Sequence, residues 1–152
     1  MGLTHIKVGI ANPARPKQTV QLTFLVDSGA VYSVIPAAVL RKLRVKPHSK
    51  RTFILADGSE ITRKIGDVLF RLDGRQGAAP VIFGEEDDST LLGAVSLEAL
   101  GMTLDPMKRE LRPLPMLLAS QPLAADFVRS LRGALKGEKS AYAVLLKERK
   151  PE

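Results

Sequence analysis

One carboxylate stands between two strand-forming stretches, in the turn Asp27-Ser28-Gly29-Ala30. Because β-branched and aromatic residues favour strands, we expect residues 23–26 and 31–35 to form two buried strands joined by this turn. Gly29 permits close backbone approach or positive φ, Ser28 supplies a small hydroxyl, and Ala30 adds no bulk. A carboxylate held in an open loop between rigid strands is suited to general acid–base chemistry.

The length and composition predict one folded domain with a real core. The chain has 152 residues, of which 45% are hydrophobic, too many for a disordered chain. It contains no cysteine, which excludes disulfides and thiolate metal ligands, and His5 and His48 lack metal-ligand spacing. We therefore expect no metal and no cofactor.

The formal charge of +7 and the pI near 9.9 raise the question of nucleic-acid binding. The basic residues are scattered and few aromatic residues accompany them, which favours a solvated basic surface and no nucleic-acid partner. Residues 1–10 lack the apolar core of a signal peptide, and no apolar run approaches the ~18 residues of a membrane span. We expect a cytoplasmic protein with no membrane partner.

The remaining pattern predicts many short strands and two short helices. The expected strands cover residues 4–10, 18–26, 31–35, 52–56, 60–65, 67–72, 79–83, 91–93, 102–104 and 109–112. The expected helices cover residues 37–43, with Pro36 at the first helical position, and 95–100, stopped by Gly101. The pair Asp57-Gly58 predicts a hairpin with a type I′ turn. The acidic residues 84–88 form a loop that we interpret as a solvated charge run rather than a metal site.

The Asp27-Ser28-Gly29-Ala30 turn resembles the Asp-Thr/Ser-Gly-Ala signature of retropepsin-like aspartic proteases, of the bacterial single-lobe type. Three later features follow in the family's order, namely the hairpin tip, the Leu91-Leu92-Gly93 strand and the short helix ending at Gly101. The resemblance implies an all-β, single-lobe acid-protease fold, a closed β-barrel with one or two short helices. It makes Asp27 the catalytic residue of an active-site loop formed with Ser28, Gly29 and Ala30.

The resemblance also assigns residues around the substrate. The flap would comprise Ala56, Asp57, Gly58 and Ser59. The adjacent strands and substrate pocket would include Val81, Leu91, Leu92 and Gly93. Viral members of the family place an acid after the alanine and an arginine after the late glycine, where this chain has Val31 and Ala94. Since both charges are missing together, we expect apolar packing to support the site.

Aspartic protease chemistry needs two carboxylates that share one proton. Asp57 and Asp73 fall at polar hairpin tips and Asp105 precedes a proline, so none of them matches Asp27. The second carboxylate must then come from another copy of the chain. We therefore expect a homodimeric aspartic endopeptidase that hydrolyses a protein or peptide substrate with an Asp27/Asp27′ pair.

The last part of the chain lies outside the resemblance. We expect a protease domain over residues 1–115, a linker over 116–123 and a helical C-terminal tail over 124–152, with Phe127, Leu131 and Leu135 on one helix face. The tail loosely resembles the partner-binding tails of small bacterial antitoxins, although a helical appendage packing on its own domain or dimer is the commoner arrangement. The alternative function is a catalytically silent dimeric β-module whose tail binds a protein partner.

Overall fold

The computed structural model describes residues 4–115 and Arg129. The chain divides into two compact units, residues 1–114 and 115–152. The expected linker and tail lie outside the described residues, apart from Arg129, which is helical. The elements of the first unit are β1 Thr4–Asn12, β2 Arg15–Val26, β3 Ser33–Pro36, α1 Ala37–Lys42, β4 Ser49–Ile54, β5 Glu60–Leu72, β6 Arg75–Gly84, β7 Leu91–Leu92, α2 Ala94–Ala99, β8 Met102–Asp105 and β9 Glu110–Pro113.

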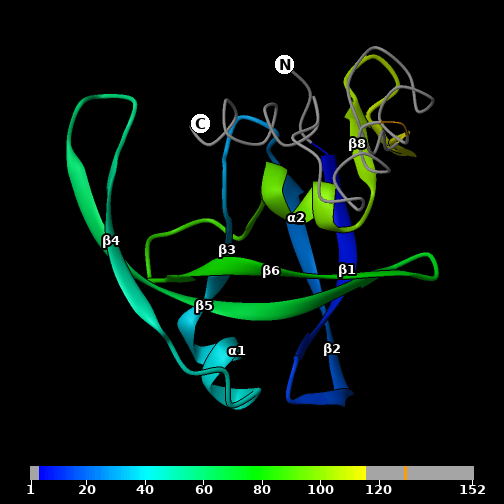
Figure 1. Cartoon of the computed structure of the whole chain (residues 1–152). Coiled ribbons are helices and arrows are strands. Elements are labelled where there is room, and N and C mark those ends of the chain that lie inside the picture. Colours follow the sequence, from blue (N-terminus) through cyan, green and yellow to red (C-terminus); the bar gives the residue numbers. More distant parts are fainter. Residues whose placement is uncertain (1–3, 116–128, 130–152) are drawn as a thin grey trace. The chain divides into compact units, whose positions relative to one another are not determined.

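Seven of the strands form one sheet that closes on itself (Figure 1). Its order is β1-β2-β7-β3-β6-β5-β4, and β1 also pairs with β5 through Gly9 to Ala11. Six strands therefore make a ring, and β4 extends from it as the outer strand of the β4–β5 hairpin. Strands β8 and β9 form a separate two-stranded sheet. The predicted all-β closed barrel with short helices is confirmed.

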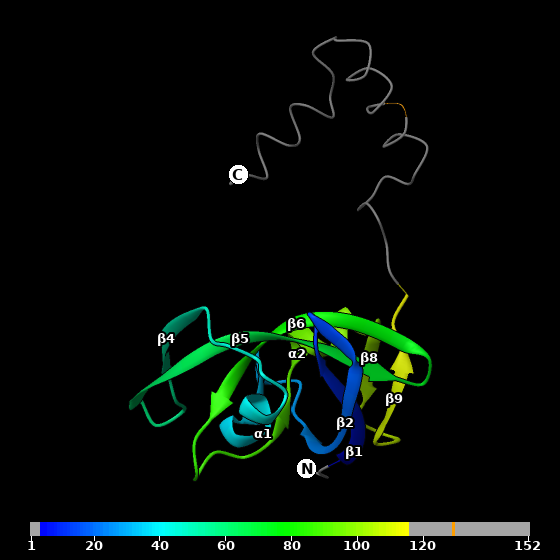
Figure 2. The same ribbon diagram turned by 90° about the horizontal axis from the view of Figure 1, so that it is seen from below.

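The interior of the ring is filled by alternate side chains of its strands. Phe24 on β2 and Phe70 on β5 are fully buried, and their ring centroids lie 6.1 Å apart. Truncating either ring to alanine is expected to cost about 3–5 kcal/mol. Leu40 of α1 and Leu97 of α2 join the same core, so both short helices are fixed by packing against the sheet (Figure 2).

The two Asp-Gly hairpin tips adopt different turns. Asp73 and Gly74 have φ of 49° and 77°, which is the type I′ geometry between β5 and β6. At the β4–β5 tip only Gly58 has positive φ, at 87°, and its N–H donates to the Leu55 carbonyl at 2.9 Å. The expected type I′ turn at Asp57-Gly58 is wrong, because Asp57 accepts hydrogen bonds from the Ser59 N–H and hydroxyl within a longer loop.

The two short helices begin and end at residues that suit those positions. Pro36 is the N-cap of α1 and the last residue of β3, one position earlier than expected. After α1 the chain turns through Arg44 at φ 61°, and the Asn12 side-chain amide donates to the Leu43 and Arg44 carbonyls at 3.1 and 2.9 Å. Gly101 ends α2 with φ of 68°, as expected. Within residues 4–115, no helix is long and apolar enough to cross a membrane.

Candidate functional site

The Asp27 turn is held by its own backbone and by β7. The Asp27 N–H donates to the Leu92 carbonyl at 3.0 Å, and the Ala30 N–H donates to the Asp27 carbonyl at 3.1 Å. The Gly29 N–H donates to Oδ1 of Asp27 at 2.9 Å, which orients the carboxylate. Asp27, Ser28 and Gly29 are all exposed. A rigid backbone thus presents an oriented carboxylate to the outside of the single chain.

The loop that carries Asp27 is longer than the sequence pattern indicates. Strand β3 begins at Ser33, so Val31 and Tyr32 belong to the loop and not to a strand beginning at residue 31. The carbonyls of Ala30 and Val31 accept hydrogen bonds from the Ala94 and Val95 N–H groups, at 2.8 and 3.0 Å. Because those carbonyls bond to the first residues of α2, they do not join a strand ladder.

Gly93 lies where the loop and α2 come closest. A Cβ at this position would stand 2.7 Å from the carbonyl carbon and oxygen of Tyr32 and 2.9 Å from the Ala30 oxygen. These distances are too short for any side chain, which confirms the expected close backbone approach behind Leu91-Leu92-Gly93. Gly93 also precedes α2 as its N-cap. Any larger residue here must displace the loop that positions Asp27.

Two buried serines join the start of β3, directly after the loop, to α2. Ser33 Oγ and Ser96 Oγ lie 2.6 Å apart, both side chains are fully buried, and the Gly93 N–H donates to Ser33 Oγ at 2.9 Å. Val31, by contrast, is 61% exposed. The expectation that apolar packing replaces the missing charge pair is therefore wrong, because hydroxyl and backbone hydrogen bonds hold this region. Ser33 and Ser96 were not predicted as site residues, and nothing in their spacing marks them as partners.

The β4–β5 hairpin is joined to the Asp27 loop through one aromatic side chain. Tyr32 packs edge-on against Phe53 of β4, with ring centroids 6.1 Å apart. Arg51 of β4 donates to the Tyr32 hydroxyl, and its guanidinium carbon lies 5.6 Å from the centre of the tyrosine ring. Beyond this contact the expected flap residues Ala56, Asp57, Gly58 and Ser59 are exposed at the hairpin tip.

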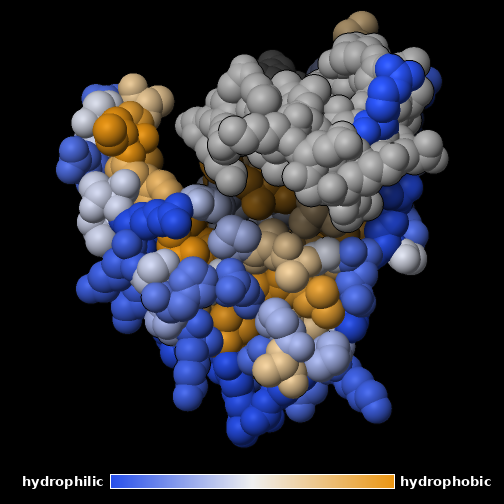
Figure 3. All heavy atoms as spheres, viewed as in Figure 1, coloured by the Kyte–Doolittle hydropathy of each residue, from blue (hydrophilic) through white to orange (hydrophobic). Residues whose placement is uncertain are grey.

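A pocket of about 570 Å³ lies between the Asp27 loop and the β4–β5 hairpin. Val34, Ile82 and Leu91 line it from three neighbouring strands, and Phe53, Ile54, Leu55 and Ile61 line it from the hairpin. Figure 3 shows hydrophobic side chains gathered on that hairpin, which stands apart from the body of the domain. Three of the four exposed large hydrophobic residues within the described ranges, Val31, Ile54 and Leu55, line this pocket.

Of the four residues assigned to the substrate pocket and the adjacent strands, only Leu91 lines this pocket. Val81 is fully buried in the core, and the adjacent Ile82 faces the pocket, because successive side chains of a strand point to opposite sides. Leu92 and Gly93 are likewise buried behind the loop, whereas Leu91 borders the pocket. On β6 the residue that lines the pocket is thus Ile82 and not Val81.

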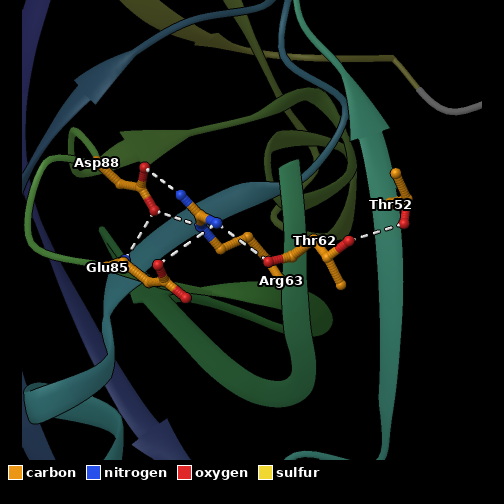
Figure 4. Close-up of polar contacts among 5 residues, drawn as sticks. All are labelled: Thr52, Thr62, Arg63, Glu85 and Asp88. Carbon is orange, nitrogen blue, oxygen red and sulfur yellow. Dashed lines mark hydrogen bonds and ion pairs between the residues drawn. The ribbon is translucent and has the colours of Figure 1, made fainter. Parts of the chain in front are cut away.

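An ion pair between Arg63 and Asp88, two residues that line the pocket, is drawn in Figure 4. Arg63 of β5 donates from Nε and Nη2 to the two Asp88 carboxylate oxygens at 2.7 and 3.1 Å, and Glu85 lies 3.5 Å from Nη1. The hydrogen bonds from Arg63 hold the pKa of Asp88 below its usual value. The loop over residues 84–88 is therefore not merely a solvated charge run, because Asp88 is tied to the sheet.

The comparisons with known proteins bear on the fold. The sequence matches no protein-family model and no curated protein. Among solved structures, the EIAV protease complexed with the inhibitor HBY-793 is similar with a TM-score of 0.51 and 21% identity, over 68% of this chain and 93% of that one. This likeness shows that the β-domain has the retropepsin-like aspartic protease fold.

Two further solved structures are similar at lower scores. The simian foamy virus (mac) protease gives a TM-score of 0.42 at 20% identity, over 61% of this chain and 92% of its own. The foamy viral protease-reverse transcriptase in complex with an RNA/DNA hybrid gives 0.48 at 18% identity, over 84% of this chain and 14% of its own. The fold assignment therefore rests on the EIAV protease, whose score is above 0.5.

Proposed function

We propose that the chain is an aspartic endopeptidase whose active site forms between two copies, with one Asp27 from each. The observation that carries the proposal is the Asp27 turn itself. Its carboxylate is exposed and oriented by the Gly29 N–H, while its backbone is bonded to Leu92. A catalytic carboxylate must be held this firmly because a small misplacement of a reacting group costs a large part of the rate.

The chemistry requires a second carboxylate beside the first. One carboxylate, ionised, takes a proton from a water that attacks the peptide carbonyl, and the other, protonated, donates to the developing oxyanion. Within the described residues, the hydrogen bonds of Asp27 are to its own turn and to β7, so a single copy supplies one half of the pair.

A two-fold dimer supplies the other half. A symmetric interface brings the same surface of each copy together, so two exposed Asp27 turns facing across the axis place their carboxylates side by side. Ser28, exposed next to Asp27, can then bridge the two turns through its hydroxyl.

The pocket beside the turn supplies the place for a peptide. Val31, Ile54 and Leu55 are exposed in the single chain, yet all three line the same cavity. Exposed apolar side chains that gather in one hollow indicate a binding surface. A peptide side chain that lies between the hairpin and the loop would cover these three residues, and the backbone of the peptide would then lie near Asp27.

Cleavage of a peptide library by the purified chain tests the proposal. We expect pepstatin-sensitive cleavage between mildly acidic and neutral pH, and at least a ~100-fold loss in Asp27→Asn, because asparagine is neither base nor acid. The matched control is Asp73→Asn, since Asp73 sits at an exposed hairpin tip with positive φ that asparagine tolerates. Absence of cleavage by a folded dimer would contradict the proposal and favour the silent β-module.

A further inference from the structure

A second pocket, of about 850 Å³, lies at the base of the β4–β5 hairpin next to α1. It shares only Arg63 with the pocket beside Asp27. Five exposed cationic side chains line it, namely Arg41, Arg44, Lys46, Lys50 and Lys64. Its one acidic residue, Glu85, already lies 3.5 Å from Arg63.

The charges of this pocket are left uncompensated. Within residues 4–115, none of the five cationic side chains has a carboxylate at ion-pair distance, the ion pairs being formed by His48, Arg63 and Arg112 instead. Formal charge of one sign in a concave surface produces a strong local potential that attracts anions. The pocket thus has an electrostatic preference for anions that residues 4–115 do not satisfy.

The strand register places two lysines of this pocket directly opposite each other. Lys50 and Lys64 are directly opposite on β4 and β5. Like charges in that position are destabilising. The neighbouring opposed pair, Arg51 and Arg63, shows the contrast, because Arg51 bonds to Tyr32 and Arg63 to Asp88. In that pair Asp88 neutralises Arg63 and the tyrosine hydroxyl accepts a hydrogen bond from Arg51, whereas Lys50 and Lys64 both face an open pocket.

The lining also indicates what kind of anion fits. The only aromatic residue that lines the pocket is Phe83, which is 6% exposed and so offers no face on which a base could stack. Phosphate groups carry high charge in a small volume, accept bidentate hydrogen bonds from arginine and bind lysine as a point charge. A cavity of this size suits a small ligand.

We propose that this pocket binds a chain of phosphate groups, either a free oligophosphate or the backbone of a single-stranded nucleic acid. Lys50 and Lys64 hold one end from the hairpin, and Arg41 and Arg44 approach from the end of α1. Bound phosphate relieves the repulsion between the two lysines and so stabilises the hairpin stem. This inference does not depend on the protease activity.

The test is binding of sodium tripolyphosphate to the full chain, measured by titration calorimetry at low and physiological salt. We expect wild type to bind, with affinity falling as salt screens the charges, and Lys50→Gln/Lys64→Gln to bind about tenfold more weakly. The matched control is Lys7→Gln/Lys17→Gln, which removes the same charge from exposed positions of β1 and β2 outside the pocket and should change affinity less than about twofold. Equal weakening by both double variants, or no binding to wild type, would overturn the proposal.

Two further probes separate the sources of phosphate. A thymidine oligonucleotide that binds more tightly than tripolyphosphate, and loses affinity in Lys50→Gln/Lys64→Gln alone, supports the site with a nucleic-acid backbone as its ligand. Tighter binding of tripolyphosphate supports a free oligophosphate. A glutamate-rich peptide of equal charge that binds as tightly as either would show that the pocket does not distinguish phosphate, and would overturn the assignment. Without ligand, the double variant should unfold at a slightly higher temperature than wild type, since the opposed charges are gone.

Discussion

Arg51 of β4 donates a hydrogen bond to the Tyr32 hydroxyl, joining the β4–β5 hairpin to the loop that carries Asp27. Tyr32→Phe keeps the aromatic contact with Phe53 and removes the acceptor. We expect a stability loss of no more than about 1 kcal/mol, because the bond is partly exposed, and about a tenfold slower cleavage, because the hairpin loses its fixed position over the site. Denaturant unfolding and peptide cleavage measure the two effects.

The control for this change lies on the same hairpin. Thr52 and Thr62 share a hydroxyl hydrogen bond of 2.9 Å on exposed positions of β4 and β5 (Figure 4), and neither residue lines the pocket beside Asp27. Thr62→Val should therefore leave cleavage close to wild type. If it slows cleavage as much as Tyr32→Phe does, hairpin stability in general, and not the Arg51–Tyr32 contact, controls the rate.

The buried serine pair predicts unequal effects on stability. Ser33→Ala leaves the buried Gly93 N–H without its acceptor, whereas Ser96→Ala leaves Ser33 still bonded to that N–H. We expect the first to lower the free energy of unfolding by about 2–3 kcal/mol and the second by about 1 kcal/mol. In urea unfolding, the double variant should lose less than the sum of the two. Additive and equal losses would show that the three groups do not act as one network.

Gly58 and Gly74 allow a test of the flap with matched backbone strain. Both have positive φ, at 87° and 77°, and both have open space where a side chain would go. Valine at either position is strained to a similar degree, so Gly58→Val and Gly74→Val should lower the unfolding free energy by comparable amounts, of order 1–3 kcal/mol. Only Gly58→Val should slow cleavage strongly, since Gly74 lies at the tip of β5–β6. Parental cleavage by Gly58→Val would remove the flap assignment.

The Arg63–Asp88 pair predicts how stability depends on pH. The pKa of Asp88 is lowered by Arg63, so its folded value lies below its unfolded value, and the pair contributes stability above about pH 4 that is lost as pH falls further. Urea unfolding from pH 7 to pH 2.5 should therefore show wild type more stable than Asp88→Asn at neutral pH, with the gap closing below about pH 4. Asp73→Asn, which removes one carboxylate that forms no ion pair within residues 4–115, is the charge control. A gap that stays constant across that range would contradict the assigned ion pair.

Much of the fold could be predicted from the sequence because it depends on short local patterns of residues. The Asp27 turn, the short helix stopped by Gly101 and the Gly93 close approach each depend on a few neighbouring residues, and each is present. The type of turn was harder to predict, because the same Asp-Gly pair makes a type I′ turn at Asp73 and a longer loop at Asp57. The length of the loop, and not the pair alone, decides between them.

What could not be predicted depends on residues far apart in the chain. Ser33 and Ser96 meet across 63 positions, and Arg63 meets Asp88 across 25, and neither pair leaves a pattern in the sequence. The apolar stretch over residues 79–83 gives no alternation that shows which side chains face inward, so Val81 was assigned to the pocket and Ile82 was overlooked. The loop residues Val31 and Tyr32 have strand propensity. They do not form a strand, because the carbonyls of Ala30 and Val31 accept hydrogen bonds from the first residues of α2.

The most direct test of the central claim is to mix wild-type and Asp27→Asn protomers and measure peptide cleavage at constant total protein. In an equal mixture of wild-type and mutant chains that exchange freely, about a quarter of the dimers carry two aspartates. The account predicts that cleavage falls to about that fraction of the all-wild-type rate, and that it varies as the square of the wild-type share across other mixing ratios. Cleavage that falls in direct proportion to the wild-type share would mean that each copy works alone, and would contradict the shared Asp27 pair.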